Sequence, residues 1–157
     1  MNWIDWLGNP VTRKPDRIGA SASAVIFDER GQVLLMQRAD NGFWGVPGGN
    51  MEIGESVTQA TAREVFEETR LIVSVGRLVG VYSDPSNYMI ASYPNGSLVH
   101  YVNLCFVCKP VGGVLQGSDE GRELAYFAPD ALPEKVLLPH RLRIQDALAN
   151  QVEPFIR

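Results

Sequence analysis

Short apolar runs alternate with polar turn sequences along the chain, and this pattern predicts several β-strands. Two apolar runs, Ala20–Phe27 and Gln32–Arg38, flank the turn sequence DERG and predict a β-hairpin. Further strands are expected in LVGVYS, VHYVNLCFVCK and ELAYFAP. The long polar stretch DPSNYMIASYPNGSL, between the first two of these strands, is expected to be a loop, and loops of this length are usually functional or disordered.

Two other stretches carry helical signals. Ser56, followed three residues later by Gln59, forms a capping box, so a helix is expected from about Val57 to about Thr69. From Pro139, the stretch PHRLRIQDALANQ places apolar residues among charges and predicts a second, amphipathic helix. The order of the elements predicts an α/β sandwich in which a mixed β-sheet carries a helix on each face.

Length and composition favour one domain. The chain has 157 residues, of which 45% are hydrophobic, and this is enough for one core but not for two full domains. Residues 1–17 are expected to form an N-terminal arm of a single domain spanning residues 1–157. In this arm, Trp3, Trp6 and Leu7 are spaced as on one face of a helix. They could cover an edge of the core or contact the partner in a homodimer, and both interpretations stay open.

The charge of the chain limits its partners. Lys and Arg number 14 against 18 Asp and Glu, giving a net charge of -4, so no basic surface for long nucleic acids is expected. The N-terminal sequence lacks an apolar targeting segment, and no window approaches the roughly 20 apolar residues that span a bilayer. We therefore expect a soluble, cytoplasmic protein without a membrane partner. A small anionic ligand would need a metal ion or a local basic patch.

The cysteines and histidines do not form a metal or redox motif. Cys105 and Cys108 are spaced as C-x-x-C, but they lie in a predicted strand, where a spacing of three directs the side chains to opposite faces. Two buried free thiols are expected there. His100 and His140 lack metal-ligand spacing and are interpreted as structural or surface residues.

Glutamates crowd the end of the first predicted helix. Glu64, Glu67 and Glu68 stand at i, i+3 and i+4 and project from one face, whereas Val65 and Phe66 project from the opposite, buried side. Like charges at these spacings repel each other, and near the helix C-terminus they also oppose the macrodipole. Mg²⁺ or Mn²⁺ would relieve both effects, because carboxylate oxygens favour hard cations. A solvated acidic face would carry the same residues, so the helix alone does not decide between the two.

A longer pattern surrounds this helix. It consists of Gly49, five residues, Glu55, seven residues and the run Arg63-Glu64-Val65-x-Glu67-Glu68-x-x-Leu71, preceded by Val46-Pro47-Gly48. The pattern resembles the box of the Nudix hydrolases, and the resemblance extends over roughly residues 18 to 140. One position departs from it, because the family has a glycine where this chain has Arg70. That position is expected to cap the helix in the left-handed conformation, where a Cβ costs roughly 1 kcal/mol.

The resemblance implies a fold, a reaction and a cofactor. The fold would be a Nudix-like α/β/α sandwich with a mixed β-sheet and a loop–helix–loop catalytic box. The reaction would be hydrolysis of a pyrophosphate bond in a nucleoside diphosphate linked to another moiety, such as ADP-ribose, a nucleotide sugar or a (d)NTP. Glu64, Glu67, Glu68 and the carbonyl of Gly48 would hold about one to three Mg²⁺ or Mn²⁺ ions.

The resemblance also implies roles for further residues. Glu55 and Arg63 would pair to orient the helix against the loop, and Glu67 or Glu68 would be the general base. Some members of the family take an additional carboxylate from a late loop. For that role Glu120 is our first choice and Glu123 our second, and a solvated loop carboxylate is the competing interpretation for both.

Substrate selection is expected outside the box. Trp44, Tyr82 and Tyr88 could form a stacking surface for a base, and Arg38 could contact phosphate, although each could equally serve packing or solvation. A different class of function also remains open. With Arg70 at the glycine position and the late carboxylate unplaced, the chain could be a catalytically weak module that binds or senses a nucleotide.

Overall fold

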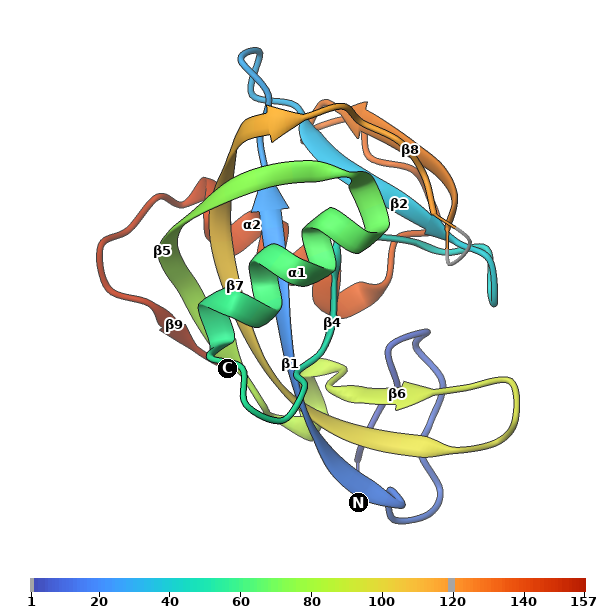
Figure 1. Cartoon of the computed structure of the whole chain (residues 1–157). Helices are drawn as coiled ribbons and strands as arrows, with labels where there is room; N and C mark the ends of the chain where they lie inside the picture. The colour runs from blue at the N-terminus through green and yellow to red at the C-terminus, as the bar shows by residue number, and fades with distance from the viewer. Residues whose placement is uncertain (1, 119–120) are drawn as a thin grey trace.

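A mixed β-sheet forms the centre of the molecule, and one helix packs on each of its faces (Figure 1). The computed structural model describes residues 2–118 and 121–157. Within these residues the strands are β1 Arg17–Ile26, β2 Val33–Arg38, β3 Trp44–Gly45, β4 Gly48–Asn50, β5 Leu71–Tyr82, β6 Ile90–Ser92, β7 Leu98–Gly113, β8 Gly121–Phe127 and β9 Phe155–Ile156. The helices are α1 Val57–Thr69, the 3₁₀ helix η1 Pro85–Asn87 and α2 Leu138–Leu148. The predicted α/β sandwich is confirmed.

The strands of the described residues form two sheets. The larger has the order β4-β1-β7-β5-β9, with β6 also paired to β7, and the smaller has the order β3-β2-β8. The larger sheet is mixed, because β1 runs parallel to β7 while β4 and β5 run antiparallel to their neighbours. The long pairing of β1 with β7, from Arg17↔Val99 to Ile26↔Cys108, places residues far apart in the sequence side by side at the centre.

The expected β-hairpin between β1 and β2 does not form. β1 pairs with β4 and β7, β2 pairs with β3 and β8, and between the two strands the structure has the single isolated bridge Phe27↔Val33. The turn itself is present, since the Asp28 carboxylate accepts hydrogen bonds from the backbone N–H groups of Arg30 and Gln32. This turn carries the chain from one sheet into the other, because distant strands compete successfully for both edges of β1.

Alternating side chains of β1 supply two hydrophobic cores. Val25 packs with Ile144 of α2 in one core, and Ala24 and Ile26 pack with Val65 of α1 in the other. Each helix is therefore held by apolar contacts to its own face of the sheet, as expected for a sandwich.

The two cysteines confirm the strand interpretation of their segment. Cys105 lies in the core under α2, and Cys108 lies in the core under α1. Both are buried free thiols, and burial raises the pKa of Cys108 to about 12. A shared zinc or redox site is excluded by their opposite orientations.

Helix α1 begins and ends where the local signals place it. The Ser56 hydroxyl accepts from the Gln59 N–H at 3.2 Å, and the Gln59 side chain accepts from the Ser56 N–H at 2.8 Å. At the other end Arg70 adopts φ 63° and donates its N–H to the carbonyl of Phe66. Phe66, expected on the buried side, is 43% exposed, and the Arg70 guanidinium lies 5.3 Å from its ring centre.

The stretch expected to be a long polar loop is partly regular. It contains η1 and β6, and β6 pairs with β7. Ile90 and Ala91 are buried, because the N-terminal arm packs on them: the Trp6 N–H donates to the Ile90 carbonyl, and the indole lies in a cluster with Ala91 and Leu137. Trp6 thus covers an edge of the core of its own chain, and a homodimer stays a prediction.

None of the helices in the described residues is both long enough and apolar enough to cross a membrane.

Candidate active site

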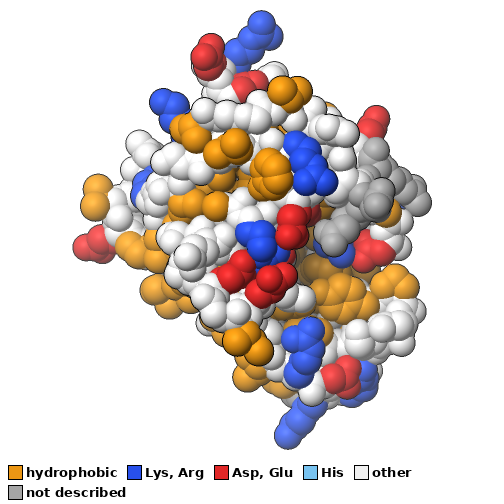
Figure 2. All heavy atoms as spheres, viewed as in Figure 1, with side chains coloured by type: hydrophobic (Ala, Val, Ile, Leu, Met, Phe, Trp, Pro, Cys, Tyr) orange, Lys and Arg blue, Asp and Glu red, His pale blue; other side chains and the backbone are white. Residues whose placement is uncertain are grey.

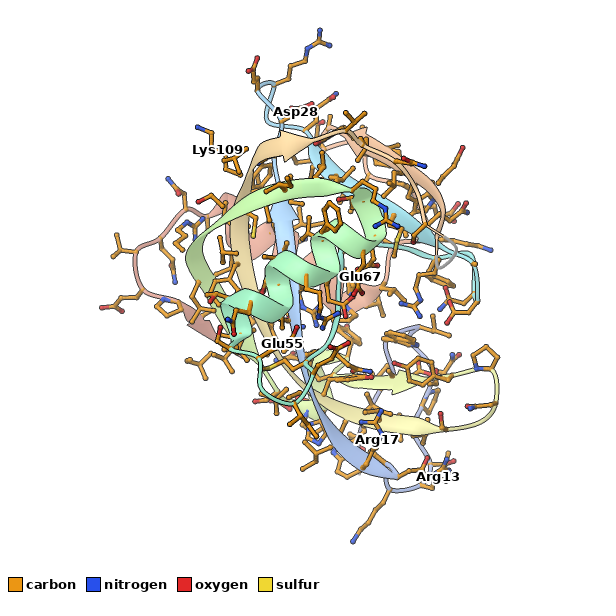
Figure 3. All side chains as sticks on the ribbon, viewed as in Figure 1. Arg13, Arg17, Asp28, Glu55, Glu67 and Lys109 are labelled. Atoms are coloured by element: carbon orange, nitrogen blue, oxygen red, sulfur yellow. The ribbon has the colours of Figure 1, made fainter. Side chains whose placement is uncertain are left out.

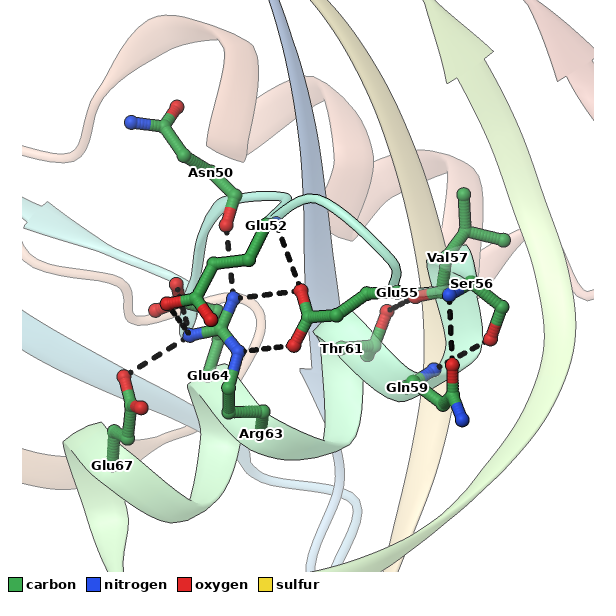
Figure 4. Close-up of polar contacts among 10 residues, drawn as sticks. All are labelled: Asn50, Glu52, Glu55, Ser56, Val57, Gln59, Thr61, Arg63, Glu64 and Glu67. Atoms are coloured by element: carbon green, nitrogen blue, oxygen red, sulfur yellow. Dashed lines mark hydrogen bonds and ion pairs between the residues drawn. The ribbon is translucent and has the colours of Figure 1, made fainter.

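Arg63 organises the acidic cluster along α1 (Figure 4). Its Nε donates to Glu55, and its Nη2 donates to the second oxygen of the same carboxylate at 3.1 Å. Nη1 donates to Glu64 at 2.9 Å and to Glu67 at 3.1 Å, and Nη2 also donates to the carbonyl of Asn50 at 3.0 Å. One planar guanidinium therefore ties the preceding loop to two turns of the helix.

The pair of Glu55 and Arg63 is electrostatically matched. The hydrogen bond from Arg63 lowers the pKa of the Glu55 carboxyl, and the same bond raises the pKa of Arg63. Glu55 also accepts from the backbone N–H of Glu52 at 2.9 Å, which holds the loop in place. Figure 3 shows Glu55 beside the start of α1 and Glu67 toward its end. The charges of the cluster are thus distributed along the whole helix.

Two of the three glutamates of the triad are buried, so the alternative of a fully solvated acidic face does not hold. Glu64 is 9% exposed and Glu68 is 2% exposed. The reason is the glycine backbone of β4: Glu68 accepts from the Gly48 N–H at 2.8 Å, and a Cβ on Gly49 would lie only 2.7 Å from the Glu64 carboxylate carbon. Glycine therefore allows the strand to approach the carboxylates directly.

The donor set suits a hard divalent cation. The carboxylates of Glu64, Glu67 and Glu68 and the carbonyl of Gly48 offer only oxygen atoms, which Mg²⁺ and Mn²⁺ prefer. In the part of the chain that the structure describes, no three acidic, histidine or cysteine side chains are arranged as a metal cluster, and Arg63 bridges Glu64 and Glu67 instead. Glu64, Glu67, Glu68 and the carbonyl of Gly48 are the groups of this cleft that would hold such a cation.

The acidic cluster lines part of a cleft of about 630 Å³. In Figure 2 acidic side chains gather around a basic one in the middle of this face, beside a hollow with a partly hydrophobic wall. The other lining residues come from β1, β2, β7, α2, the arm and the η1–β6 region; they are Trp6, Ser21, Ala22, Ser23, Met36, Arg38, Ala39, Asp40, Tyr88, Met89, Ala91, Tyr93, Tyr101, Asn103, Pro139, His140 and Arg143. A cavity of this size holds a small organic ligand.

Two of the four residues expected at the substrate line this cleft. Arg38 and Tyr88 do so, and Arg38 is held by a two-point contact with Asp40 at 2.9 and 2.8 Å. Tyr82 is fully buried and its hydroxyl donates to Asp146, so its ring cannot stack on a base and the expectation was wrong.

Trp44, the fourth of these residues, is absent from the cleft lining as well. It packs edge-on against Phe127, 5.1 Å between ring centres, beside the core under α2. Trp44 and Phe127 belong to the same small sheet, and their packing against this core accounts for the aromatic residue, contrary to its expected contact with the substrate.

The structure describes one of the two late carboxylates, Glu123. Glu120 lies outside the described residues. Glu123 is exposed on β8, opposite Gln37, and does not line the cleft.

Several cleft residues were not expected from the sequence. Trp6 and Tyr93 form an aromatic wall with 5.3 Å between ring centres, and the Arg38 guanidinium lies 5.0 Å from the Trp6 ring. His140 and Arg143 come from α2. The WIDWL motif was a usable signal for Trp6, but no local signal marked the two residues of α2, since their places depend on how that helix packs.

His140 is a partly buried, neutral imidazole in the lining of the cleft. Its Nδ1 accepts from the backbone N–H of Val46 at 2.9 Å, and burial lowers its pKa well below 6.5. Gly45 permits this contact, because a Cβ there would lie 2.6 Å from Nδ1. His140 therefore connects α2 to the loop that leads into β4.

Comparisons with known proteins agree with this arrangement. A family model described as the NUDIX domain matches residues 17–149. A MutT-like protein from Streptomyces ambofaciens is 36% identical over 143 residues, which cover 91% of this chain and 84% of that protein. An ADP-ribose pyrophosphatase from Methanocaldococcus jannaschii is 36% identical over 124 residues, covering 77% of this chain and 68% of that protein. The crystal structure of an ADP-ribose pyrophosphatase from Streptococcus suis has the same fold, with a TM-score of 0.66 and 24% identity over 88% of this chain and 97% of that one. The chain belongs to the Nudix hydrolase family.

Proposed function

We propose that this Nudix hydrolase cleaves a pyrophosphate bond of a nucleoside diphosphate derivative with the help of Mg²⁺ or Mn²⁺. The observation that carries the proposal is the position of Glu64, Glu67, Glu68 and Gly48 along one side of a cleft of about 630 Å³. All four offer oxygen ligands, at a place where a small ligand can bind.

The metal ions would supply charge neutralisation for the pyrophosphate oxygens and a lowered pKa for the attacking water. Glu64, Glu67, Glu68 and the Gly48 carbonyl would hold them. Arg63 is a positioning residue, because its contacts to Glu64 and Glu67 fix the directions of both carboxylates.

A carboxylate of the protein would accept the proton of the attacking water. The water oxygen forms a bond to one phosphorus, the bridging P–O bond breaks, and the released phosphate oxygen carries away the electron pair. The proton of the water passes to Glu67 or Glu68. Glu67 is the better candidate, since its side chain is exposed to the cleft whereas Glu68 already accepts from the Gly48 N–H.

The substrate would be ADP-ribose, a nucleotide sugar or a (d)NTP. A relative that is 36% identical bears the name ADP-ribose pyrophosphatase and one that is 33% identical bears the name 8-oxo-dGDP phosphatase, so the relatives leave the base of the nucleotide open. Arg38 and Tyr88 line the cleft and would contact the substrate, Arg38 through its charge and Tyr88 through its ring.

The deciding experiment is a hydrolysis panel with Mg²⁺ or Mn²⁺, containing ADP-ribose, nucleotide sugars, dinucleoside polyphosphates and normal and oxidised (d)NTPs, with products separated by chromatography. Glu67→Gln should reduce turnover by about 10²- to 10⁴-fold, the usual contribution of a general base. Glu153→Gln makes the same chemical change at an exposed residue outside the cleft and should leave turnover unchanged.

Two results would contradict the proposal. A Glu67→Gln variant as active as the parent would remove the role given to this carboxylate. Tight nucleotide binding without products over hours, in the folded protein with Mg²⁺, would indicate a nucleotide-sensing module in place of an active hydrolase.

A further inference from the structure

Arg143 is a buried cation that the proposed reaction leaves without a role. Its side chain, in the second turn of α2, is 4% exposed and lines the cleft. Among the described residues, Nε has no hydrogen-bond partner, and Nη2 donates to the sulfur of Met89 at 3.5 Å. A thioether is a weak acceptor, so this guanidinium has one buried donor without a partner and a second that is only weakly bonded.

No negative charge compensates Arg143 in the part of the chain that the structure describes. Its guanidinium lies 5.4 Å from the ring centre of Tyr82, and the neighbouring His140 is neutral. Asp146, one turn later on α2, is engaged elsewhere, because its two oxygens accept from Arg157 at 2.8 and 3.0 Å.

Packing alone does not explain an arginine at this place. The contact with the ring of Tyr82 could be made by an uncharged side chain such as methionine, without the cost of burying a charge. An unsatisfied buried donor in a ligand-sized cleft is more readily explained by a ligand that supplies the acceptors.

We propose that Arg143 is a specificity residue that donates to the O6 and N7 atoms of a 6-oxopurine base and so favours such a base over adenine. The inference rests on the proposed function, because it places a nucleotide in the same cleft. A guanidinium matches the two adjacent acceptors O6 and N7, whereas adenine presents an amino donor in place of O6.

The surroundings favour a base over a phosphate at this end of the cleft. Met89 contacts Arg143 directly, and the lining of the whole cleft also includes Met36, Ala91 and Tyr93. Apolar and aromatic side chains of this kind suit a planar ring. The other two arginines of the cleft are already paired with carboxylates, Arg38 with Asp40 and Arg63 with four glutamates. A phosphate would therefore meet a single uncompensated cation and lose most of its water.

The test compares the binding of IMP and AMP by calorimetry, since these nucleotides carry the 6-oxo and the 6-amino group on the same purine ring and ribose phosphate. The parent protein should bind IMP about tenfold more tightly than AMP, within the range expected for a two-point contact to a base edge. Arg143→Met should reduce the ratio of the two dissociation constants to about one. Arg143→Lys keeps the charge but offers one donor point, so it should give an intermediate ratio.

Arg141→Met is the matched control. It removes an arginine from the same helix that donates to the carbonyls of Pro133 and Glu134 and does not line the cleft. This variant should keep the parent's preference for IMP. Thermal melting checks that each variant is folded. If Arg143→Met does not fold, the ratios of the two dissociation constants in the parent and in Arg143→Lys test the proposal.

Several outcomes would overturn the proposal. They are equal binding of AMP and IMP by the parent, an unchanged ratio in Arg143→Met, and no binding of either nucleotide at millimolar concentration. If Arg143→Met lost the same factor of affinity for IMP, AMP and ribose 5-phosphate, the arginine would bind the phosphate and not the base. AMP and IMP contain no pyrophosphate bond, so this test is decided even if the hydrolysis panel yields no product.

Discussion

At the scale of the residue, His140 couples the stability of the protein to pH. In the folded protein it is partly buried and accepts from the Val46 N–H, and desolvation keeps its pKa well below 6.5. The unfolded chain has the usual pKa near 6.5 and binds the proton first when the pH falls. The stabilising effect of the neutral imidazole is therefore complete above pH 6.5 and is lost progressively below it.

Replacing His140 by Gln should isolate this effect, because glutamine can accept the same hydrogen bond but does not titrate. We expect the difference in the free energy of unfolding between the parent and His140→Gln to narrow by about 1 kcal/mol from pH 6.5 to pH 5.5. Urea unfolding at pH 7.5, 6.5 and 5.5 measures it. A difference that stays constant over these three values would mean that His140 takes up its proton equally in the folded and the unfolded state.

At the scale of the element, α1 shows which features can be predicted from neighbouring residues in the sequence and which cannot. The capping box of Ser56 and Gln59 and the left-handed position of Arg70 were both predicted, because each depends on neighbours within one turn. The depth of Glu64 and Glu68 was not predicted, because it depends on β4 approaching through Gly48 and Gly49. A helical wheel gives the relative directions of side chains, but not the partner that each direction meets.

The end of α1 offers a direct test of backbone strain. Arg70 has φ 63°, a conformation that a residue with a Cβ adopts at a cost and glycine adopts freely. Arg70→Gly should therefore exceed Arg70→Ala in the free energy of unfolding by about 1 kcal/mol. Both variants remove the contact of the guanidinium with Phe66, so the comparison isolates the backbone.

Urea denaturation of the two variants measures this difference. If Arg70→Ala were as stable as Arg70→Gly, the Cβ would not strain the cap, and the departure from the family pattern would have no energetic consequence. Catalytic activity of the two variants should agree, since neither changes a carboxylate of the acidic cluster.

At the scale of the whole molecule, the sequence predicted the layers but not the pairing of the strands. The runs that became β1 and β2 were recognised, yet they belong to different sheets, because β7, more than 70 residues later, pairs along β1. The cleft shows the same limit. Glu64, Glu67 and Glu68 follow from one local motif, whereas Trp6 and Arg143 reach the cleft only through the packing of the arm and α2.

The N-terminal arm therefore forms part of the cleft wall, although the family match begins only at residue 17. Trp6 lines the cleft, packs on Tyr93 and donates from its indole to the Ser92 carbonyl at 3.1 Å. Removing one aromatic wall of a base-binding cleft should weaken substrate binding more than it slows the chemical step.

We expect Trp6→Ala to raise KM by about tenfold for the substrate that the panel identifies, with a smaller change in kcat. Trp3→Ala is the matched control, because it removes the same ring from the same arm at a residue that does not line the cleft. Steady-state kinetics of both variants, with melting curves to confirm folding, measure the effect. An equal rise in KM for the two variants would show that the arm acts through general stability, whereas a rise confined to Trp6→Ala would identify the indole as part of the binding surface.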